Sequence, residues 1–109
     1  MLPKKYRLPV RFFFGKKATV SRSETIILKS FDAENHYSRL GVVISKAISK
    51  SAVKRNKIKR ILFSFFQENQ KTISVKDFLL IPTPRISELT KERIDDELSR
   101  LFRKKNSHI

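Results

Sequence analysis

The residues best suited to chemistry form a basic cluster in the middle of the chain. Residues 54–60 supply five cations and one amide side chain within seven positions. The planar forks of Arg55 and Arg60 suit a phosphate or a base edge, and Asn56 adds both a donor and an acceptor. No acid lies at residues 35–67 to neutralise these charges. The cluster predicts contact with the phosphates of a nucleic acid, and a solvated helix face is the competing interpretation.

The whole chain carries the same bias. Its 109 residues include 25 Lys or Arg against 10 Asp or Glu, which gives a formal net charge of +15. A surface this basic repels itself unless a partner neutralises it. Nucleic acid is the favoured partner and an anionic membrane surface the next, because solubility alone needs only a small net charge.

Aromatic side chains beside basic ones form a second group with binding chemistry. Three phenylalanines at residues 12–14 follow Arg11, and Tyr6 precedes Arg7. Aromatic rings next to cations can stack on unpaired bases. A core position is the competing interpretation, since at least one of the three phenylalanines must be buried.

Catalytic machinery is sparse. The absence of Cys excludes disulfides, thiolate metal sites and Cys nucleophiles. Two glycines cannot build a glycine-rich phosphate loop. His36 and His108 could serve acid–base cleavage of RNA, but a turn and the end of the chain are the simpler places for them. The carboxylates at residues 95–97 predict a solvated helix face, so we expect no catalytic residue and no metal site.

A small folded domain must position these residues. The β-branched residues 25–31 predict a strand, residues 32–38 a turn, and residues 39–46 a second strand. Antiparallel pairing of the two strands across the turn is the simplest topology. Ser51 is a suitable N-cap for a helix over residues 52–69.

That helix is predicted to have a core side and a basic side. At 100° per residue, one arc gathers four apolar side chains, Ile58, Ile61, Leu62 and Phe65. The far side gathers four polar side chains, Asn56, Lys57, Arg60 and Ser64. The core side would anchor the helix while the basic side faces a partner.

The remaining elements complete a single small domain. Residues 75–81 predict a third strand, and Thr90 caps a last helix whose apolar side is Ile94, Leu98, Leu101 and Phe102. The order strand, strand, helix, strand, helix predicts an α+β fold in which helices pack on a small mixed sheet. We expect a basic N-terminal segment over residues 1–11, irregular or briefly helical, and a flexible tail over residues 103–109. No apolar run is long enough to span a membrane and the basic start lacks a signal peptide, so we expect a cytoplasmic protein.

One motif resembles the protein subunit of bacterial ribonuclease P. That family carries a Ser-Lys, a short spacer, and an Ala-Val before an Arg-Asn-Arg-x-Lys-Arg helix; here Ser45-Lys46 precedes Ala-Val-Lys-Arg-Asn-Lys-Ile-Lys-Arg at residues 52–60. Arg7-Leu8, residues 78–82 and residues 89–102 resemble its start, the strand after its basic helix, and its last helix. Two positions depart from the pattern. Lys57 replaces an Arg and loses a bidentate fork, and Ala47 replaces a common second Lys.

The resemblance implies both fold and function. It implies a left-handed βαβ crossover around the basic helix. It also implies a non-catalytic subunit of an endoribonuclease, in which a catalytic RNA removes the 5′ leader of precursor tRNA by metal-dependent hydrolysis. The partners would be the catalytic RNA subunit and precursor tRNA, with no membrane and no protein partner required. Mg²⁺ is expected in the RNA–protein complex, with no dedicated site on the protein.

The resemblance also assigns roles to residues. Those expected to hold the catalytic RNA are Arg55, Asn56, Lys57, Lys59, Arg60, Lys46, Lys50 and Lys54. Those expected to meet the leader are Phe12, Phe14, Arg7 and Arg11. Two other functions stay open: a ribosomal protein or other structural RNA-binding protein, which the co-purifying RNA would reveal, and a self-sufficient ribonuclease using His36.

Overall fold

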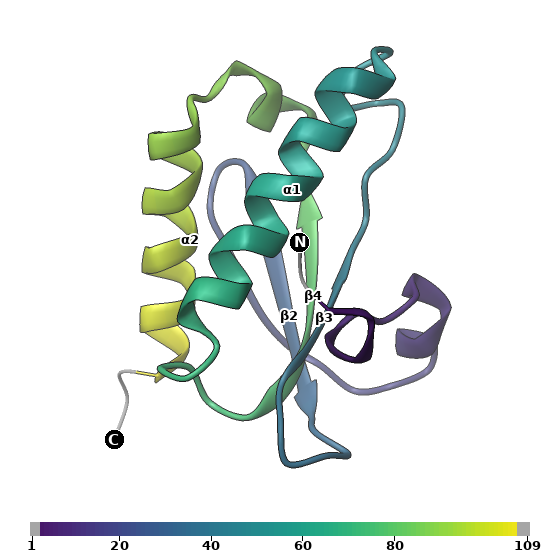
Figure 1. The fold of residues 1–109 in the computed structure, drawn as a ribbon, viewed down its shortest axis with the longest axis vertical. Helices are drawn as coiled ribbons and strands as arrows, with labels where there is room; N and C mark the ends of the chain where they lie inside the picture. Colours follow the sequence, from purple (N-terminus) through teal and green to yellow (C-terminus); the bar gives the residue numbers. More distant parts are fainter. Residues whose placement is uncertain (1–2, 107–109) are drawn as a thin grey trace.

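Two helices pack on one face of a four-stranded sheet in the computed structural model, which describes residues 3–106 (Figure 1). The strands are β1 (Thr19–Arg22), β2 (Ile26–Asp32), β3 (Arg39–Val42) and β4 (Lys76–Pro82), in the sheet order β1-β2-β4-β3. The helices are α1 (Ala52–Asn69) and α2 (Lys91–Asn106), with short 3₁₀ helices η1 (Lys4–Tyr6), η2 (Val10–Phe13) and η3 (Pro84–Glu88). The predicted α+β arrangement with a mixed sheet is confirmed.

The predicted antiparallel pairing of residues 25–31 with residues 39–46, which form β2 and β3, is wrong. β4 lies between β2 and β3, antiparallel to β2 and parallel to β3. Four consecutive residues of β4, from Asp77 to Leu80, are buried, as expected for a central strand covered on both faces. α1 connects the parallel strands β3 and β4, so the chain has a βαβ crossover at the predicted place, and its left-handedness stays a prediction.

The sequence did not predict β1. This strand pairs antiparallel with β2, where Thr19 lies opposite Ser30. It is mostly exposed, and Val20 is its single aliphatic residue, so no apolar alternation marked it. β3 is also shorter than predicted and ends at Val42.

α1 has the predicted bounds and the predicted core side. The Ser51 hydroxyl accepts a hydrogen bond from the backbone N–H of Lys54 at 3.2 Å, which caps the helix. The four predicted apolar side chains are buried, and Phe63 and Phe66 join them. Within the described residues, no helix has the length and apolar character that crossing a bilayer would require.

α2 is capped as predicted but runs further. The Thr90 hydroxyl accepts a hydrogen bond from the backbone N–H of Arg93 at 3.2 Å. The predicted apolar side, Ile94, Leu98, Leu101 and Phe102, is buried. The helix continues to Asn106, so residues 103–106 are helical where a flexible tail was predicted. The rest of that tail, with His108, lies outside the described residues.

The N-terminal segment covers the outer edge of the sheet. The backbone N–H of Leu8 donates to the carbonyl of Leu40 at 2.9 Å, and Arg7 forms an isolated parallel bridge to the same residue. The two short helices η1 and η2 lie on either side of this contact. β3 therefore has a partner along both edges, which removes an open edge from the sheet.

A second, smaller core lies on the sheet face away from the helices. Phe13 is buried there against Phe31 and Leu79, which confirms that one phenylalanine of the triplet is a core residue. Gly41 makes this packing possible, because a Cβ at that position would lie only 2.6 Å from the Phe13 ring and 3.0 Å from the carbonyl oxygen of Leu8. The N-terminal segment is thus fastened to β3 and β4.

Candidate nucleic-acid interface

The solvent side of α1 carries the predicted basic face. Lys54, Asn56, Lys57 and Arg60 are exposed, and Arg55 and Lys59 are partly buried. Throughout the described part of the chain, every ion pair involves other residues, so none of these cations is neutralised by a carboxylate. The first turn of α1 also contains no acid, so the positive end of the helix dipole adds to the same field. The basic face is available to a polyanion.

The two arginines of this face have different internal contacts. Arg55 Nη1 donates to the carbonyl of Ser49 at 2.8 Å, whereas Arg60 Nε donates to the carbonyl of Asn56 at 3.4 Å within the same helix. A guanidinium has five N–H donors, so both arginines keep donors for a ligand. Arg55 additionally holds the spacer that precedes the helix.

That spacer carries the other two predicted lysines. Lys46 and Lys50 are exposed, while Ile48 between them is buried in the main core. A turn closed by the hydrogen bond from Ile48 N–H to the Ser45 carbonyl at 3.1 Å sets this alternation. Both lysines therefore lie at the N-terminal end of α1, next to the basic face.

One basic residue of the stretch without acids, Arg39, is not available to bind a nucleic acid. Arg39 forms a two-pronged contact with Asp77, from Nε to Oδ1 at 3.2 Å and from Nη2 to Oδ2 at 3.0 Å. These residues are direct partners in the parallel pairing of β3 with β4, and Asp77 is fully buried. The hydrogen bonds to Asp77 raise the pKa of Arg39. We infer that this pair fixes the register of β3 against β4. Arg39 is thus neutralised by Asp77, an acid distant in the sequence that the fold brings next to it.

A hollow of about 250 Å³ lies on the opposite face of the sheet. Four strand residues line it, Lys29, Phe31, Leu79 and Ile81, together with Val43 just after β3. The stretch before β1 adds Val10, Phe13, Phe14, Lys16 and Ala18. Phe14 is 75% exposed at this hollow. Apolar surface beside lysines suits an unpaired base and its phosphate.

The structure separates the four residues predicted to meet the leader. Phe14 lines the hollow, whereas Phe12 lies outside its lining and packs edge-on against Phe13 at 5.3 Å. Arg7 lies in a different pocket, and Arg11 is exposed on η2.

Sequence reasoning missed other residues of the hollow, above all Lys29 and Phe31. The period of two along a strand places these two side chains on one face of β2. That alternation was the signal that could have found them.

A pocket of about 380 Å³ joins the N-terminal segment to the basic face. Lys4 and Arg7 line it from one side, and Lys59 and Phe63 of α1 from the other. Val10 lines both this pocket and the hollow. The cations of the N-terminal segment and of α1 therefore belong to one continuous surface.

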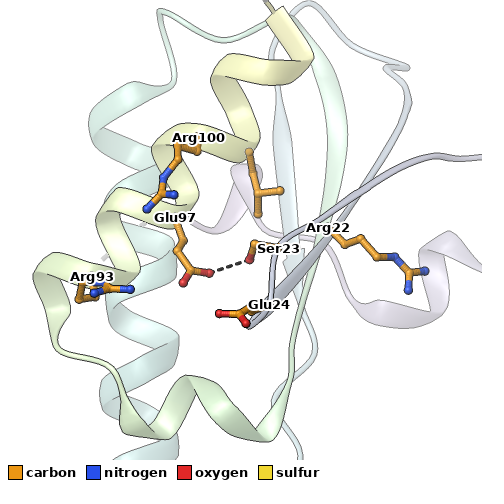
Figure 2. A pocket seen from close by; sticks show the side chains of 7 residues that line it. Arg22, Ser23, Glu24, Arg93, Glu97 and Arg100 are labelled. Atoms are coloured by element: carbon orange, nitrogen blue, oxygen red, sulfur yellow. Dashed lines mark hydrogen bonds between the residues drawn. The ribbon is translucent and has the colours of Figure 1, made fainter.

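A pocket of about 400 Å³ between the β1–β2 turn and α2 has a different character (Figure 2). Buried Glu97 accepts hydrogen bonds from the hydroxyls of Ser23, at 2.7 Å, and Thr25. Burial raises the pKa of Glu97, but these hydrogen bonds and the nearby Arg100 and Arg93 outweigh it, so its pKa lies below the usual 4.5. Since Glu24 also lines this pocket, its mixed charge does not suit a polyanion. We interpret it as a tie between sheet and helix.

Comparison with known sequences matches almost the whole chain. The family described as Ribonuclease P matches residues 2–106. The ribonuclease P protein component of Desulforapulum autotrophicum is 34% identical over 106 residues, covering 94% of this chain and 90% of the relative. The component of Bacillus pumilus is 35% identical over 92 residues, covering 84% of this chain and 76% of the relative.

Solved structures match the fold as well. A mutant RNase P protein of Staphylococcus aureus, described as defective in mRNA degradation activity, has a TM-score of 0.86 and 25% identity, covering 94% of this chain and 90% of that one. The RNase P protein of Thermotoga maritima has a TM-score of 0.79 and 25% identity, covering 90% and 96%. The arrangement of sheet and helices described above is therefore similar to theirs.

Proposed function

This chain belongs to the ribonuclease P protein family, and from that premise we propose how it takes part in tRNA processing. The basic face of α1, with Lys46 and Lys50, binds the catalytic RNA subunit. The hollow on the other sheet face receives the single-stranded 5′ leader of precursor tRNA. One observation carries this proposal: among residues 3–106, the cations on the solvent side of α1 form no ion pair with a carboxylate, and the other side of the helix is buried in the core.

The described side chains support a binding role more than a catalytic one. The catalytic RNA and precursor tRNA are both polyanions, so each repels the other. Cations on the protein lower this repulsion and release counterions when phosphates bind. Phe14 and the floor of the hollow add sequence-tolerant stacking for the leader. We assign the hydrolysis itself to the RNA subunit.

Magnesium is the cofactor that the family resemblance implies for the complex. Mg²⁺ prefers oxygen ligands, often from carboxylates. Within residues 3–106, no three His, Asp or Glu side chains gather into a metal site, and lysines and arginines dominate both proposed RNA surfaces. These residues do not fit the ion, so we propose that the RNA subunit holds it.

Cleavage of precursor tRNA at low magnesium tests the proposal. Multiple-turnover cleavage by a bacterial catalytic RNA should be faster with this protein than without it. The protein alone should leave the substrate intact, since we place no catalytic group on it. Cleavage by the isolated protein would contradict this and support a self-sufficient ribonuclease.

The same proposal decides between the other interpretations. The family match gives no support to a ribosomal protein. A cytoplasmic location follows from the proposal, because bacterial precursor tRNA is made in that compartment. If a ribosomal RNA fragment bound more tightly than the catalytic RNA in a filter-binding assay, the assignment of partner would be wrong.

A further inference from the structure

A pocket at the C-terminal end of α1 contains both tyrosines of the chain. It has a volume of about 370 Å³, and we call it the tyrosine pocket. Its lining includes Tyr6 from η1, His36 and Tyr37 from the turn between β2 and β3, and Gln70, Lys71 and Val75 from the segment after α1. Three parts of the sequence meet here, so the pocket exists only in the folded domain.

The two rings form a fixed aromatic corner beside an ammonium group. The rings of Tyr6 and Tyr37 lie 5.2 Å apart at 90°, an edge-to-face geometry that stabilises such pairs. Lys5 Nζ lies 5.0 Å from the centre of the Tyr6 ring and 4.9 Å from that of Tyr37. Tyr6 also packs against the main core. The corner is therefore held in place before any ligand binds.

Hydrogen bonds through Ser38 hold the walls together. Gln70 Nε2 donates to the Ser38 carbonyl at 3.3 Å, and the buried Ser38 hydroxyl donates to the Ser74 carbonyl at 3.0 Å. The backbone N–H of Lys76 donates to the same hydroxyl at 3.2 Å. The turn and the segment after α1 thus move as one unit. Binding a ligand here would therefore cost the protein little conformational entropy.

The charge of the tyrosine pocket suits an anionic ligand. Lys71 is exposed at its margin, Lys5 lies over both rings, and no carboxylate is among the described residues that line it. The pocket beside α2 differs on this point, since Glu24 and Glu97 line it (Figure 2). Flat rings combined with cations favour a ligand that has both a flat ring and a phosphate.

The short helix η1 links the tyrosine pocket to the proposed RNA surface. Lys4, its first residue, lines the same pocket as Lys59 of α1, and Tyr6, its last residue, lines the tyrosine pocket. The 18 residues of α1 give a length of about 27 Å. The tyrosine pocket therefore lies about one helix length from the capped end that carries Arg55.

We propose that the tyrosine pocket binds an unpaired nucleobase of the catalytic RNA, stacked on Tyr37, with Lys5 and Lys71 at the flanking phosphates. This inference rests on the proposed function and adds a second point of contact at the far end of α1. The catalytic RNA is favoured over the leader because the connecting cations run to α1, whereas the leader hollow lies on the other sheet face.

A pair of substitutions at Tyr37 tests the stacking. Loss of one stacked base lowers affinity by roughly tenfold, so Tyr37→Leu should raise the Kd for catalytic RNA by about that factor. Tyr37→Phe keeps the ring and should stay within about twofold of the original protein. Val20→Ala, at an exposed position of β1 outside the proposed RNA surfaces, is the control and should leave the affinity for catalytic RNA unchanged. Equal affinities of the Leu and Phe variants would overturn the inference.

Chemical protection of the original protein gives a second test that does not depend on a variant folding. Tetranitromethane nitrates accessible tyrosines, and mass spectrometry separates Tyr6 from Tyr37. Catalytic RNA should protect Tyr37, whereas a leader oligonucleotide should not. If RNA binds and cleavage is stimulated but Tyr37 reacts equally with and without RNA, the tyrosine pocket is not the site and the proposed function stands. If the protein binds no RNA, the proposed function itself fails.

Discussion

Arg60 and Arg55 illustrate how single residues of the basic face differ in what they do. Arg60 is exposed, and its hydrogen bond to the Asn56 carbonyl stays within its own helix, whereas Arg55 holds the spacer through the Ser49 carbonyl. Removing Arg60 should therefore affect binding alone. Removing Arg55 should affect both binding and the position of Lys46 and Lys50.

We expect Arg60→Ala to weaken binding of the catalytic RNA by about 1–3 kcal/mol, the usual effect of losing a fork contact. Its thermal unfolding midpoint should stay unchanged, because the side chain lies off the core. Arg85→Ala is a suitable control, since Arg85 is an exposed arginine on η3 whose Nη1 lies 3.6 Å from Glu24. Filter binding at one fixed salt concentration and thermal unfolding provide the two readouts. An unfolded Arg60→Ala protein would contradict the assignment of this face.

A different residue-scale prediction concerns the pair of Arg39 and Asp77. Arg39→Met leaves the buried Asp77 carboxylate without its partner and should lower the free energy of unfolding by about 3–5 kcal/mol. Adding Asp77→Leu to the same protein should recover most of that loss, because no unpaired charge then remains. Urea unfolding of the three proteins measures this. Equal stabilities of the single and double variants would show that the pair does not fix β3 against β4.

At the scale of elements, the helices were predictable and the strand pairing was not. α1 and α2 each begin with a side chain that caps the next turn, and their apolar residues recur at helical spacing, so local signals sufficed. The central place of β4 depends on contacts between β2, β3 and residues beyond α1. Short-range pairing of β2 with β3 was the simplest prediction. β4 takes the place between them because its consecutive side chains from Asp77 to Leu80 are buried, as a central strand covered on both faces requires.

The candidate site, like the fold, was predictable only in part. The basic face could be predicted because it lies on one helix. The hollow, the pocket at Lys59 and the tyrosine pocket each need side chains from segments far apart in the sequence. No periodicity within one segment could have placed Arg7 beside Lys59 or Tyr6 beside Tyr37.

Glu97 ties the β1–β2 turn to α2 and gives the fold a pH dependence. Its folded pKa lies below the usual 4.5, so its stabilising contribution is fully present above that pH and is lost as the pH falls through the folded value. We expect Glu97→Gln to show a smaller loss of stability between neutral and acidic pH than the original protein. Urea unfolding at several pH values between 3 and 7 (roughly the range over which a carboxylate titrates) measures the difference. Parallel pH profiles would contradict this role of Glu97.

At the scale of the whole molecule, charge is unevenly distributed along the chain. Five of its ten acids lie within residues 88–97, at η3 and α2, whereas the basic face of α1 has none nearby in sequence. The molecule therefore presents a more positive side to a polyanion. This asymmetry should orient the protein as it approaches RNA.

Salt dependence tests this electrostatic account. If about six phosphates are neutralised, affinity for RNA should fall by several powers of ten between low and moderate salt. Filter binding over a range of KCl concentrations gives the slope. Lys57→Gln should make the slope of log affinity against log KCl concentration shallower, by about the amount that one phosphate contact contributes. A flat response would contradict binding through phosphates.

The position of β4 in the middle of the sheet also affects how the protein is made. A ribosome synthesises the N-terminal segment, β1, β2, β3 and α1 before β4, yet β2 and β3 meet only through that strand. Until about three quarters of the chain has been translated, neither the hollow nor the sheet face on which α1 packs can form. The nascent chain therefore exposes its cations to cellular RNA before it has a fold that can choose among RNAs.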